Sequence, residues 1–505
     1  MRDNLWVAEP VRRAVRNLRM PHVQHPKPLI TSEGKLIATR APTRERWSWA
    51  LYDFANTIFS MNIATLYFAV WLVSDLSASN TMVALGNGIS SALIAISIPL
   101  FGAISDATQR RKPWVVWFTI LACAATAAMG VIGQTVVPLI GDSVRDPVTT
   151  GYTVGGGVAV IIVASFVLAN YAYQGALPFY NAMMFELVPP NEQGRLSGMG
   201  TALGYFGAIV GVLLVTPFFS GSMPLLGNIS TGVMDFLRSI MPFTSHGGRV
   251  STFVPTAVLF LLFSLPLFIF CKDHNARPGL KAIPWKAAFS EVAHTIRDAK
   301  QYPGSLRFLL ASFLYQDAIG TIIANMALYA VMAMGFKKGL ETTLFVVLTV
   351  PAVIGSYAIG RLVDRIGPKR SLIFTIIAWV ILLLAMVMVP TRTAFWIVGA
   401  AIGLIFGGVA TSERPMLLTL VPDIEAGRFF SLMVLSSRAA AILGPFIWAF
   451  TVDGLLPSFG TAVAYRAGVV TVAIGMAASL LLLWGVPDNW KKNLAQANSF
   501  PANGK

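Results

Sequence analysis

Long apolar runs alternate with short polar stretches along most of the chain. A helix that crosses a bilayer needs about 20 mostly apolar residues, and this sequence contains twelve runs of that kind. They begin near Trp47, Thr81, Pro113, Tyr152, Leu196, Thr252, Leu306, Thr342, Ser371, Ala394, Phe429 and Arg466. The pattern predicts an all-α polytopic membrane protein with twelve transmembrane helices.

The composition agrees with this pattern. Hydrophobic residues make up 55% of the chain, charged residues make up 12%, and the mean hydropathy is +0.67. About a quarter of the residues in a soluble globular protein are charged, so that class is excluded. The first forty residues are basic and lack the apolar segment of a secretory signal. The first apolar run is therefore expected to remain as a span.

Basic residues are distributed unevenly about these spans. In a twelve-span arrangement, roughly thirty of the Lys and Arg residues fall on one side and about seven on the other. This positive-inside bias predicts that both chain termini are cytoplasmic. It also explains the net charge of +15 without nucleic acid as a partner, and it suits contact between the basic clusters and anionic membrane lipid.

A repeated pattern divides the chain into two halves. The segment Leu187–Arg195 recurs as Leu420–Arg428, and Asp53 of the first span has a counterpart in Asp317 of the seventh. A duplicated half predicts two six-helix bundles. The expected divisions are a cytoplasmic basic arm (1–46), an N-terminal six-helix bundle (47–271), a cytoplasmic linker with surface helices (272–305), a C-terminal six-helix bundle (306–487) and a cytoplasmic tail (488–505).

Two loops carry related clusters of glycine, aspartate and basic residues. The clusters are Gly102, Asp106, Arg110 and Arg111 between spans two and three, and Gly360, Asp364, Arg365, Lys369 and Arg370 between spans eight and nine. The second resembles the loop motif of the major facilitator superfamily, whereas the first departs from it at Ala107 and Gln109. The resemblance implies a cytoplasmic latch that favours one access state, in which the aspartates suit a helix amino terminus. The alternative is that the basic residues only set topology.

Three further strings resemble one branch of that superfamily. Trp49–Asn56, Phe179–Ala182 and Ser197–Gly207 are similar to the autophagy-related vacuole effluxer family and its bacterial relatives. Members are regarded as permeases, and amino-acid efflux is attributed to the fungal vacuolar relatives. The resemblance implies secondary active transport of a small polar solute, such as an amino acid or a related metabolite. It favours a bacterial inner membrane over an organelle membrane.

Polar side chains interrupt the spans that line the central cavity in the superfamily, which are spans one, four, seven and ten. Together with one arginine of span eleven, the candidates for the substrate cavity are Asn56, Ser60, Asn170, Gln174, Gln316, Thr321, Glu413, Arg414 and Arg438. For each amide the alternative is an interhelical hydrogen bond, worth about 0.6 to 2 kcal/mol. Arg438 stays charged, so it needs Asp317, Glu413 or an anionic substrate as a partner, unless it snorkels to the interface.

Asp53 and Asp317 are carboxylates within apolar spans. A charge in hydrocarbon costs at least roughly 3 kcal/mol, so such residues usually face a wet cavity or a partner. Asp53 follows Arg44 and Arg46 closely in sequence, which places it near the cytoplasmic mouth of the pathway. Gating or proton coupling therefore suits it better than cargo recognition. The alternative is a helix-end aspartate that reaches headgroup water.

No motif in the chain indicates an enzyme or an ATP-driven pump. The sequence lacks a Gly-x-x-x-x-Gly-Lys-Ser/Thr loop, a His-Glu-x-x-His pair and a Gly-x-Ser-x-Gly elbow. We expect no cofactor and no metal, and a monomer that binds a small-molecule substrate and membrane lipid, with protons as the candidate coupling ion. The alternatives are facilitated uniport, and an assembly or receptor protein that retains the fold without transport.

Overall fold

Helices make up most of the described chain. The computed structural model describes residues 40–76, 78, 80–137, 142–145, 150–153, 156–223, 227–244, 247–274, 302–336, 341–422 and 425–498. Within these ranges, eight helices are long and apolar enough to cross a membrane. Each of the twelve predicted runs coincides with one helix or with a series of consecutive helical segments, which we call a helical path. The expected all-α polytopic fold is confirmed.

The N-terminal half contains the first six paths. The first path comprises α2 (Thr43–Phe59), η1 (Ser60–Tyr67), α3 (Phe68–Val70) and η2 (Trp71–Asp75). The others are α4 (Asn80–Thr108), α5 (Lys112–Val131) with η3 (Ile132–Val136), α7 (Gly156–Leu187), α8 (Gln193–Ser220) and α10 (Phe253–Phe270). Their connections contain β1 (Asp142–Arg145), β2 (Thr150–Thr153), β3 (Ser222–Met223), β4 (Gly227–Asn228), α9 (Thr231–Ile240) and η4 (Arg249–Thr252).

The fourth path begins later than its sequence predicts. Tyr152 belongs to β2, where it lies opposite Ser143 in an antiparallel hairpin. The helix therefore starts at Gly156. An apolar run in the sequence does not show whether its first residues form a strand or the first turn of a helix.

The C-terminal half repeats the arrangement. Its elements are α12 (Ser305–Met332), α13 (Glu341–Ile366), α14 (Pro368–Met388), α15 (Arg392–Phe406), α16 (Gly408–Leu420), α17 (Ala426–Phe459), α18 (Thr461–Trp484) and α19 (Trp490–Asn498). The tenth path is interrupted at Gly407, where a Cβ would lie 1.8 Å from Oγ of Ser356 on α13. This crowding requires glycine. The break leaves α16 as a short separate helix that carries Glu413 and Arg414.

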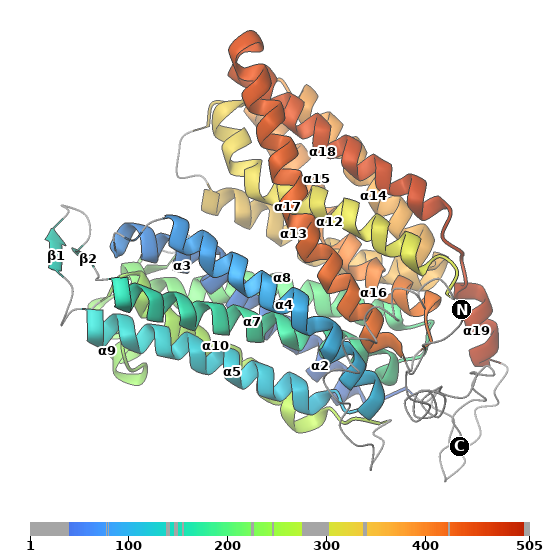
Figure 1. Ribbon diagram of the computed structural model, residues 1–505, viewed down its shortest axis with the longest axis horizontal. Helices are drawn as coiled ribbons and strands as arrows, with labels where there is room; N and C mark the ends of the chain where they lie inside the picture. The colour runs from blue at the N-terminus through green and yellow to red at the C-terminus, as the bar shows by residue number, and fades with distance from the viewer. Residues whose placement is uncertain are drawn as a thin grey trace, which may run out of the picture.

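The two halves meet at one end of the molecule and diverge toward the other (Figure 1). We call the end with α19 the terminal end, and the end with β1 and β2 the distal end. Helix α8 packs on α13 and α4 packs on α17 across the halves. A Cβ on Gly198 would lie 2.8 Å from Cα of Gly360, and one on Gly102 would lie 2.8 Å from Cα of Arg428. Glycine thus permits backbone contact where the halves meet.

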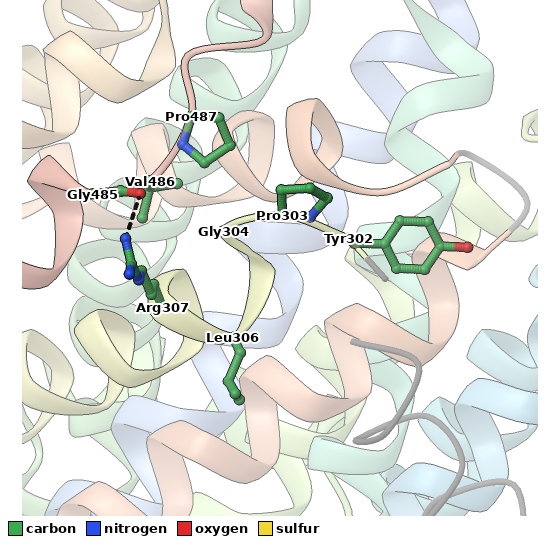
Figure 2. Close-up of a pocket in the computed structure, with 8 residues that line it drawn as sticks. All are labelled: Tyr302, Pro303, Gly304, Leu306, Arg307, Gly485, Val486 and Pro487. Carbon is green, nitrogen blue, oxygen red and sulfur yellow. Dashed lines mark hydrogen bonds between the residues drawn. The ribbon is translucent and has the colours of Figure 1, made fainter. Parts of the chain in front are cut away.

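A surface pocket lies at the terminal end of the C-terminal half (Figure 2). It has a volume of about 560 Å³ and is lined by residues that precede or begin α12 and residues that follow α18. Arg307 closes one side by donating to the carbonyl of Gly485 at 3.2 Å. The lining residues belong to one half, so this pocket is separate from the contact between the halves.

Candidate functional site

An ion pair joins the two halves. Arg414 of α16 donates from Nη1 to Oδ2 of Asp53 on α2 at 2.8 Å, and from Nη2 to Oδ1 at 3.4 Å. The Arg414 and Asp53 side chains are 13% and 8% exposed. Two N–H groups directed at two carboxylate oxygens make such a pair strongly directional. Because its partners belong to different halves, the pair exists only while the halves are close together.

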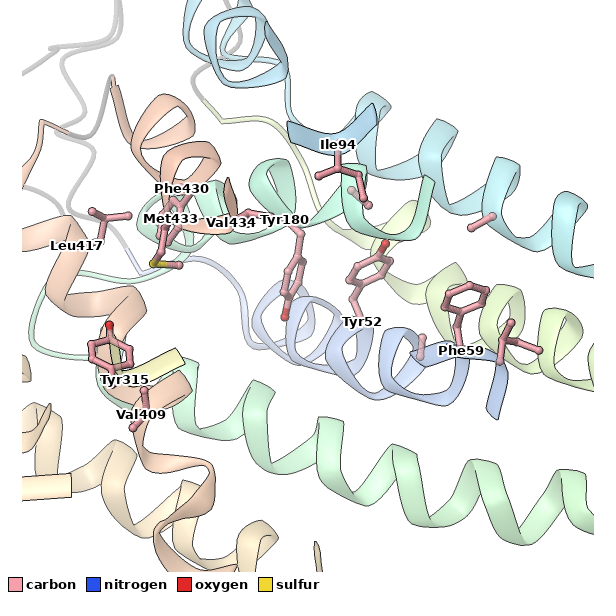
Figure 3. Close-up of a cluster of buried hydrophobic side chains, with 14 of the residues drawn as sticks. Tyr52, Phe59, Ile94, Tyr180, Tyr315, Val409, Leu417, Phe430, Met433 and Val434 are labelled. Atoms are coloured by element: carbon pink, nitrogen blue, oxygen red, sulfur yellow. The ribbon is translucent and has the colours of Figure 1, made fainter. Parts of the chain in front are cut away.

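Two aromatic residues flank this ion pair. The rings of Trp49 on α2 and Tyr180 on α7 stack with centroids 4.6 Å apart. Each polar ring group donates to the other residue's carbonyl, at 3.0 Å from Trp49 and 3.1 Å from Tyr180. Cζ of Arg414 lies 5.9 Å from the Trp49 ring centre and 5.7 Å from that of Tyr180, within the range of cation–π attraction. Figure 3 shows Tyr180 reaching from α7 toward α2.

Glycines on α8 leave room for the carboxylate. A Cβ on Gly200 would lie 2.7 Å from Oδ2 of Asp53 and 3.1 Å from the Trp49 ring. One turn later, a Cβ on Gly204 would lie 3.0 Å from Oγ1 of Thr57. A residue with a side chain at position 200 would displace Asp53. The short distance between α2 and α8 is therefore part of the site.

Glu413 is adjacent to Arg414 but is bound within the C-terminal half. Tyr315 of α12 donates to its Oε2 at 3.1 Å, and Gln316 donates to both oxygens at 3.1 and 2.9 Å. The Glu413 side chain is buried. Successive residues of a helix point about 100° apart, so α16 directs one charge to its own half and the other to the opposite half.

Asp317 has different surroundings from Asp53, although the repeat relates the two. Its Oδ1 accepts the backbone N–H of Gly444 on α17 at 2.6 Å. A Cβ on Gly444 would lie 2.0 Å from Oγ1 of Thr321 and 2.7 Å from the Asp317 carboxylate. Among the described residues, no basic side chain lies within ion-pair distance of Asp317. Within the described part of the chain, the C-terminal aspartate thus has no counterpart of the arginine that pairs with Asp53.

Asp364 forms a second contact between the halves. Its Oδ2 accepts the backbone N–H of Arg195 in the first turn of α8 at 3.0 Å, and Nε of Arg195 lies 3.8 Å away. A Cβ on Gly194 would lie 2.7 Å from Oδ1 of Asp364. A carboxylate at a helix amino terminus satisfies free N–H groups and interacts favourably with the helix dipole. Asp364 therefore links α13 to the start of α8.

The first copy of the loop cluster has a matching backbone position. Gly102 of α4 faces Gly427, Arg428 and Ser431 at the start of α17, as Gly360 faces Gly194 and Gly198 at the start of α8. Asp106 lies on α4, but its side chain is outside the part of the chain that the structure describes. The repeat places it one turn beyond Gly102, as Asp364 is one turn beyond Gly360.

Three of the basic residues in these loops are bound within their own half. Arg111 is fully buried and pairs with Glu186 of α7. Lys369 donates to the carbonyl of Trp484 at 3.1 Å and also to that of Val486. Arg370 lies 3.7 Å from Asp488. The remaining two, Arg110 and Arg365, are exposed.

The cavity candidates of spans one and four are mostly packed among helices. Asn170 donates to Oγ of Ser90 on α4 at 2.9 Å, and Gln174 donates to Asn170 at 3.1 Å. These amides and Asn56 are buried. Ser60 donates to the carbonyl of Thr57 at 3.3 Å. The interhelical hydrogen bond that sequence analysis names as the alternative for such amides is present for Asn170.

Arg438 lies on α17, but its side chain is outside the described part of the structure. The groups that sequence analysis offers as its protein partners have other contacts. Glu413 is bound by Tyr315 and Gln316, and Asp317 accepts from Gly444. The site that the described residues support is therefore centred on Asp53 and Arg414.

Sequence reasoning did not identify the aromatic residues or the glycine of this site as functional. Trp49, Tyr180 and Gly200 each lie within one of the three strings that carry the family resemblance. Their places in those strings were the signal available in the sequence, and the structure brings the three strings together at Asp53. A buried polar network around Glu186, which accepts the backbone N–H of His274 at 3.0 Å, was also missed.

Comparison with known proteins identifies the family. The profile described as "Vacuole effluxer Atg22 like" matches residues 76–496. An uncharacterized MFS-type transporter, YxiO of Bacillus subtilis, is 25% identical over 473 residues, which cover 91% of this chain and 99% of that protein. A protein of Proteus mirabilis named multidrug resistance protein MdtG is 27% identical over 55% of this chain, which spans 62% of the length of that relative.

Solved structures show the same fold. FucP, a major facilitator superfamily transporter in its outward conformation, matches with a TM-score of 0.63 and 14% identity, covering 87% of this chain and 97% of that chain. A bacterial homologue of the iron transporter ferroportin in an outward-facing state matches with a TM-score of 0.59 and 15% identity, covering 89% and 99% of the two chains. The chain is therefore a multi-pass membrane protein and not an enzyme, and it belongs to the vacuole effluxer Atg22-like family of the major facilitator superfamily.

Proposed function

We propose that this protein is a secondary active transporter that moves a small polar solute across a bacterial inner membrane by alternating access. The observation that carries the proposal is the ion pair between Asp53 and Arg414, which joins the halves in the interior of the molecule. Alternating access requires the halves to rock about a central site. A charged contact that must break when they rock is suited to be a gate.

The terminal end is assigned to the cytoplasm. Exposed basic residues gather there, including Arg110, Arg195, Arg365, Arg370 and Lys491, in agreement with the positive-inside rule. The contacts of Asp53 with Arg414 and of Asp364 with Arg195 then close the cytoplasmic side. The conformation described here is thus proposed to be open to the outside, the state in which FucP and the ferroportin homologue were solved.

Asp53 and Asp317 are proposed to have separate roles. Asp53 holds the gate closed through its ion pair with Arg414. Asp317 has a backbone amide and no described basic partner, which suits a carboxylate that takes up and releases the coupling proton. The same position of the repeat would thus serve gating in the N-terminal half and proton coupling in the C-terminal half.

The cargo is proposed to be an amino acid or a related metabolite. Arg414 and Glu413 present opposite charges on one short helix, and Gln316 lies beside them half-buried. A zwitterion could interact with both charges as the gate opens. The relatives named multidrug resistance proteins introduce drugs as the competing class of cargo, and an uncharged drug would be less compatible with charges at this position.

Transport into sealed vesicles tests the proposal. Purified protein is reconstituted, a mixture of amino acids and other small polar metabolites is supplied, and the vesicle contents are measured by mass spectrometry with and without a pH gradient. Wild-type protein should accumulate its cargo only with the gradient. Asp317→Asn should allow downhill movement without accumulation, and Asp53→Asn should slow both.

The matched control is Asp453→Asn, because Asp453 is an exposed carboxylate on α17 away from the site, and it should behave as wild type. Equal accumulation with and without the gradient would eliminate proton coupling and leave facilitated uniport. If no metabolite enters the vesicles under any condition, the receptor or assembly role replaces transport.

A further inference from the structure

The connection between spans five and six contains a short helix with an exposed apolar face. Helix α9 presents Val233, Phe236 and Ile240 at 49%, 63% and 56% exposure, and Phe243 follows at 41%. Within α9, the spacing of three and four residues places Val233, Phe236 and Ile240 along one side. A row of large apolar side chains open to the surroundings needs a partner other than water.

The other sides of α9 indicate what covers its apolar face. Met234, which points about 160° away from Phe236 at 100° per residue, is buried, and α9 packs on α8. Asp235 and Ser239 are exposed and lie about 100° and 60° from Phe236 on the other side. The helix therefore has one side toward the protein, one polar side and one apolar side between them.

The position of α9 in the chain places it at the level of a membrane surface. It follows α8 by ten residues and precedes α10, and both of these helices are membrane spans. The N–H of Ile229 donates to the carbonyl of Gly221 at 3.1 Å, which ties the start of the connection to the end of α8. The spans on either side also carry exposed apolar side chains, including Leu214 of α8 and Val258 of α10. The connection that contains α9 thus begins and ends at helices with apolar outer surfaces.

We propose that α9 lies in the interface of the distal membrane leaflet, with Val233, Phe236 and Ile240 inserted among the acyl chains. A helix with separate apolar and polar sides is suited to that position. Asp235 and Arg238 cancel in charge, so burial of apolar surface holds the helix there. Its insertion is therefore expected to be the same in zwitterionic and anionic bilayers.

Spin labels on the full-length protein test this proposal. Each label is attached to one introduced cysteine, with Cys123 and Cys271 replaced, and the protein is reconstituted in phosphatidylcholine vesicles. Labels at Phe236→Cys and Ile240→Cys should collide frequently with dissolved oxygen and rarely with a water-soluble nickel complex. Labels at the matched polar positions, Asp235→Cys and Ser239→Cys, should show the opposite order. All four side chains are exposed, so the label should be tolerated at each.

The other occupants of the apolar face give different results, and each would overturn the proposal. Frequent nickel collisions at positions 236 and 240 would place the face in water. Low access to both reagents, with spin–spin broadening that disappears on dilution with unlabelled protein, would place a second copy there. Low access to both reagents without broadening would mean that the chain covers its own face. A loss of oxygen access at these positions when phosphatidylglycerol is added to the vesicles would contradict the neutral character of the contact.

Discussion

At the residue scale, the strongest requirement of the site is that Asp53 and Arg414 occur together. Both side chains are largely removed from solvent, and a buried charge is tolerated because its partner neutralises it. The aromatic faces of Trp49 and Tyr180 add attraction for the cation only. Loss of the arginine alone leaves the Asp53 carboxylate buried without a partner, so it should destabilise the protein more than loss of both charges.

A double-mutant cycle measures this coupling. Removing one partner of a buried pair typically costs about 3–5 kcal/mol, so Arg414→Gln or Asp53→Asn alone should lower the thermal unfolding temperature clearly. The double variant should lose much less than the sum of the two. The measurement is thermal unfolding of purified protein in detergent.

The matched control for this cycle is the exposed pair of Arg370 and Asp488, whose nitrogen and oxygen atoms are 3.7 Å apart. An exposed pair is worth about 0–1 kcal/mol, so the corresponding variants should change the unfolding temperature little. Additive losses at Asp53 and Arg414 would show that the two side chains do not stabilise each other.

Gly200→Ala should disturb the gate from the opposite side. The new methyl group would lie 2.7 Å from Oδ2 of Asp53, and overpacking of this kind typically costs about 1–3 kcal/mol. Purified protein should unfold at a lower temperature and transport more slowly. Gly88→Ala on α4 has open space around it and serves as the control. Wild-type behaviour of Gly200→Ala would mean that α8 shifts without affecting the site.

At the element scale, the start of α8 depends on a residue of the other half. Asp364 of α13 accepts the N–H of Arg195, so the amino-terminal turn of one helix is completed only in the closed arrangement. The crossing of Gly198 and Gly360 brings the two helices close enough for this contact. The cap therefore stabilises one arrangement of the halves rather than the helix alone.

Asp364→Asn should shift the halves toward separation at the terminal end. Asparagine can still accept the Arg195 N–H but loses the favourable interaction of the charge with the helix dipole, worth about 0.3–1 kcal/mol, which corresponds to at most roughly a fivefold change in a two-state equilibrium. Spin labels at the exposed positions Asn191→Cys and Lys491→Cys report the separation as a distance distribution. The long-distance fraction should increase in Asp364→Asn and stay unchanged in Arg365→Gln. No increase would indicate that the loop cluster only sets topology.

At the scale of the whole molecule, charge and shape give one orientation. The terminal end combines the basic loops with the contacts between the halves, and the halves diverge away from it (Figure 1). If the positive-inside rule holds, the closed side is cytoplasmic. This orientation is independent of the identity of the cargo.

Cysteine labelling in intact cells tests the orientation. A membrane-impermeant maleimide should label Asp235→Cys in the distal connection and fail to label Lys491→Cys on α19 until the membrane is opened. Both positions are exposed, so access to the reagent decides the result. The reverse pattern would invert the proposed orientation, and the resting state would then be open to the cytoplasm.

Particular elements show how far the sequence could be read. The helical paths followed from apolar runs of bilayer length, because lipid requires every backbone polar group to bond within a helix. The break at Gly407 did not follow, since this glycine is packed against Ser356 and Tyr205 of other helices, and sequence periodicity does not report such contacts. The start of α7 was also missed, because the β1–β2 hairpin depends on pairing that apolar periodicity does not report.

The candidate site was read less completely than the fold. Asp53 was conspicuous because a carboxylate in an apolar run is costly, and Asp364 was conspicuous because its cluster occurs twice. Arg414 was assigned to the cavity together with Glu413, although its partner is 361 residues away in sequence. No local pattern links residues that far apart.

By itself, the sequence determined that the protein lies in a lipid bilayer, the number of its spans, its twofold repeat and its family. These properties depend on hydrophobicity, charge and recurrence along the chain, which are local quantities. Only the tertiary structure decided that Asp53 pairs with Arg414, that Asp317 lacks a described basic partner, and that the terminal end is closed. Those facts depend on which helices of the two halves face each other, and the packing of glycine-lined crossings determines that arrangement.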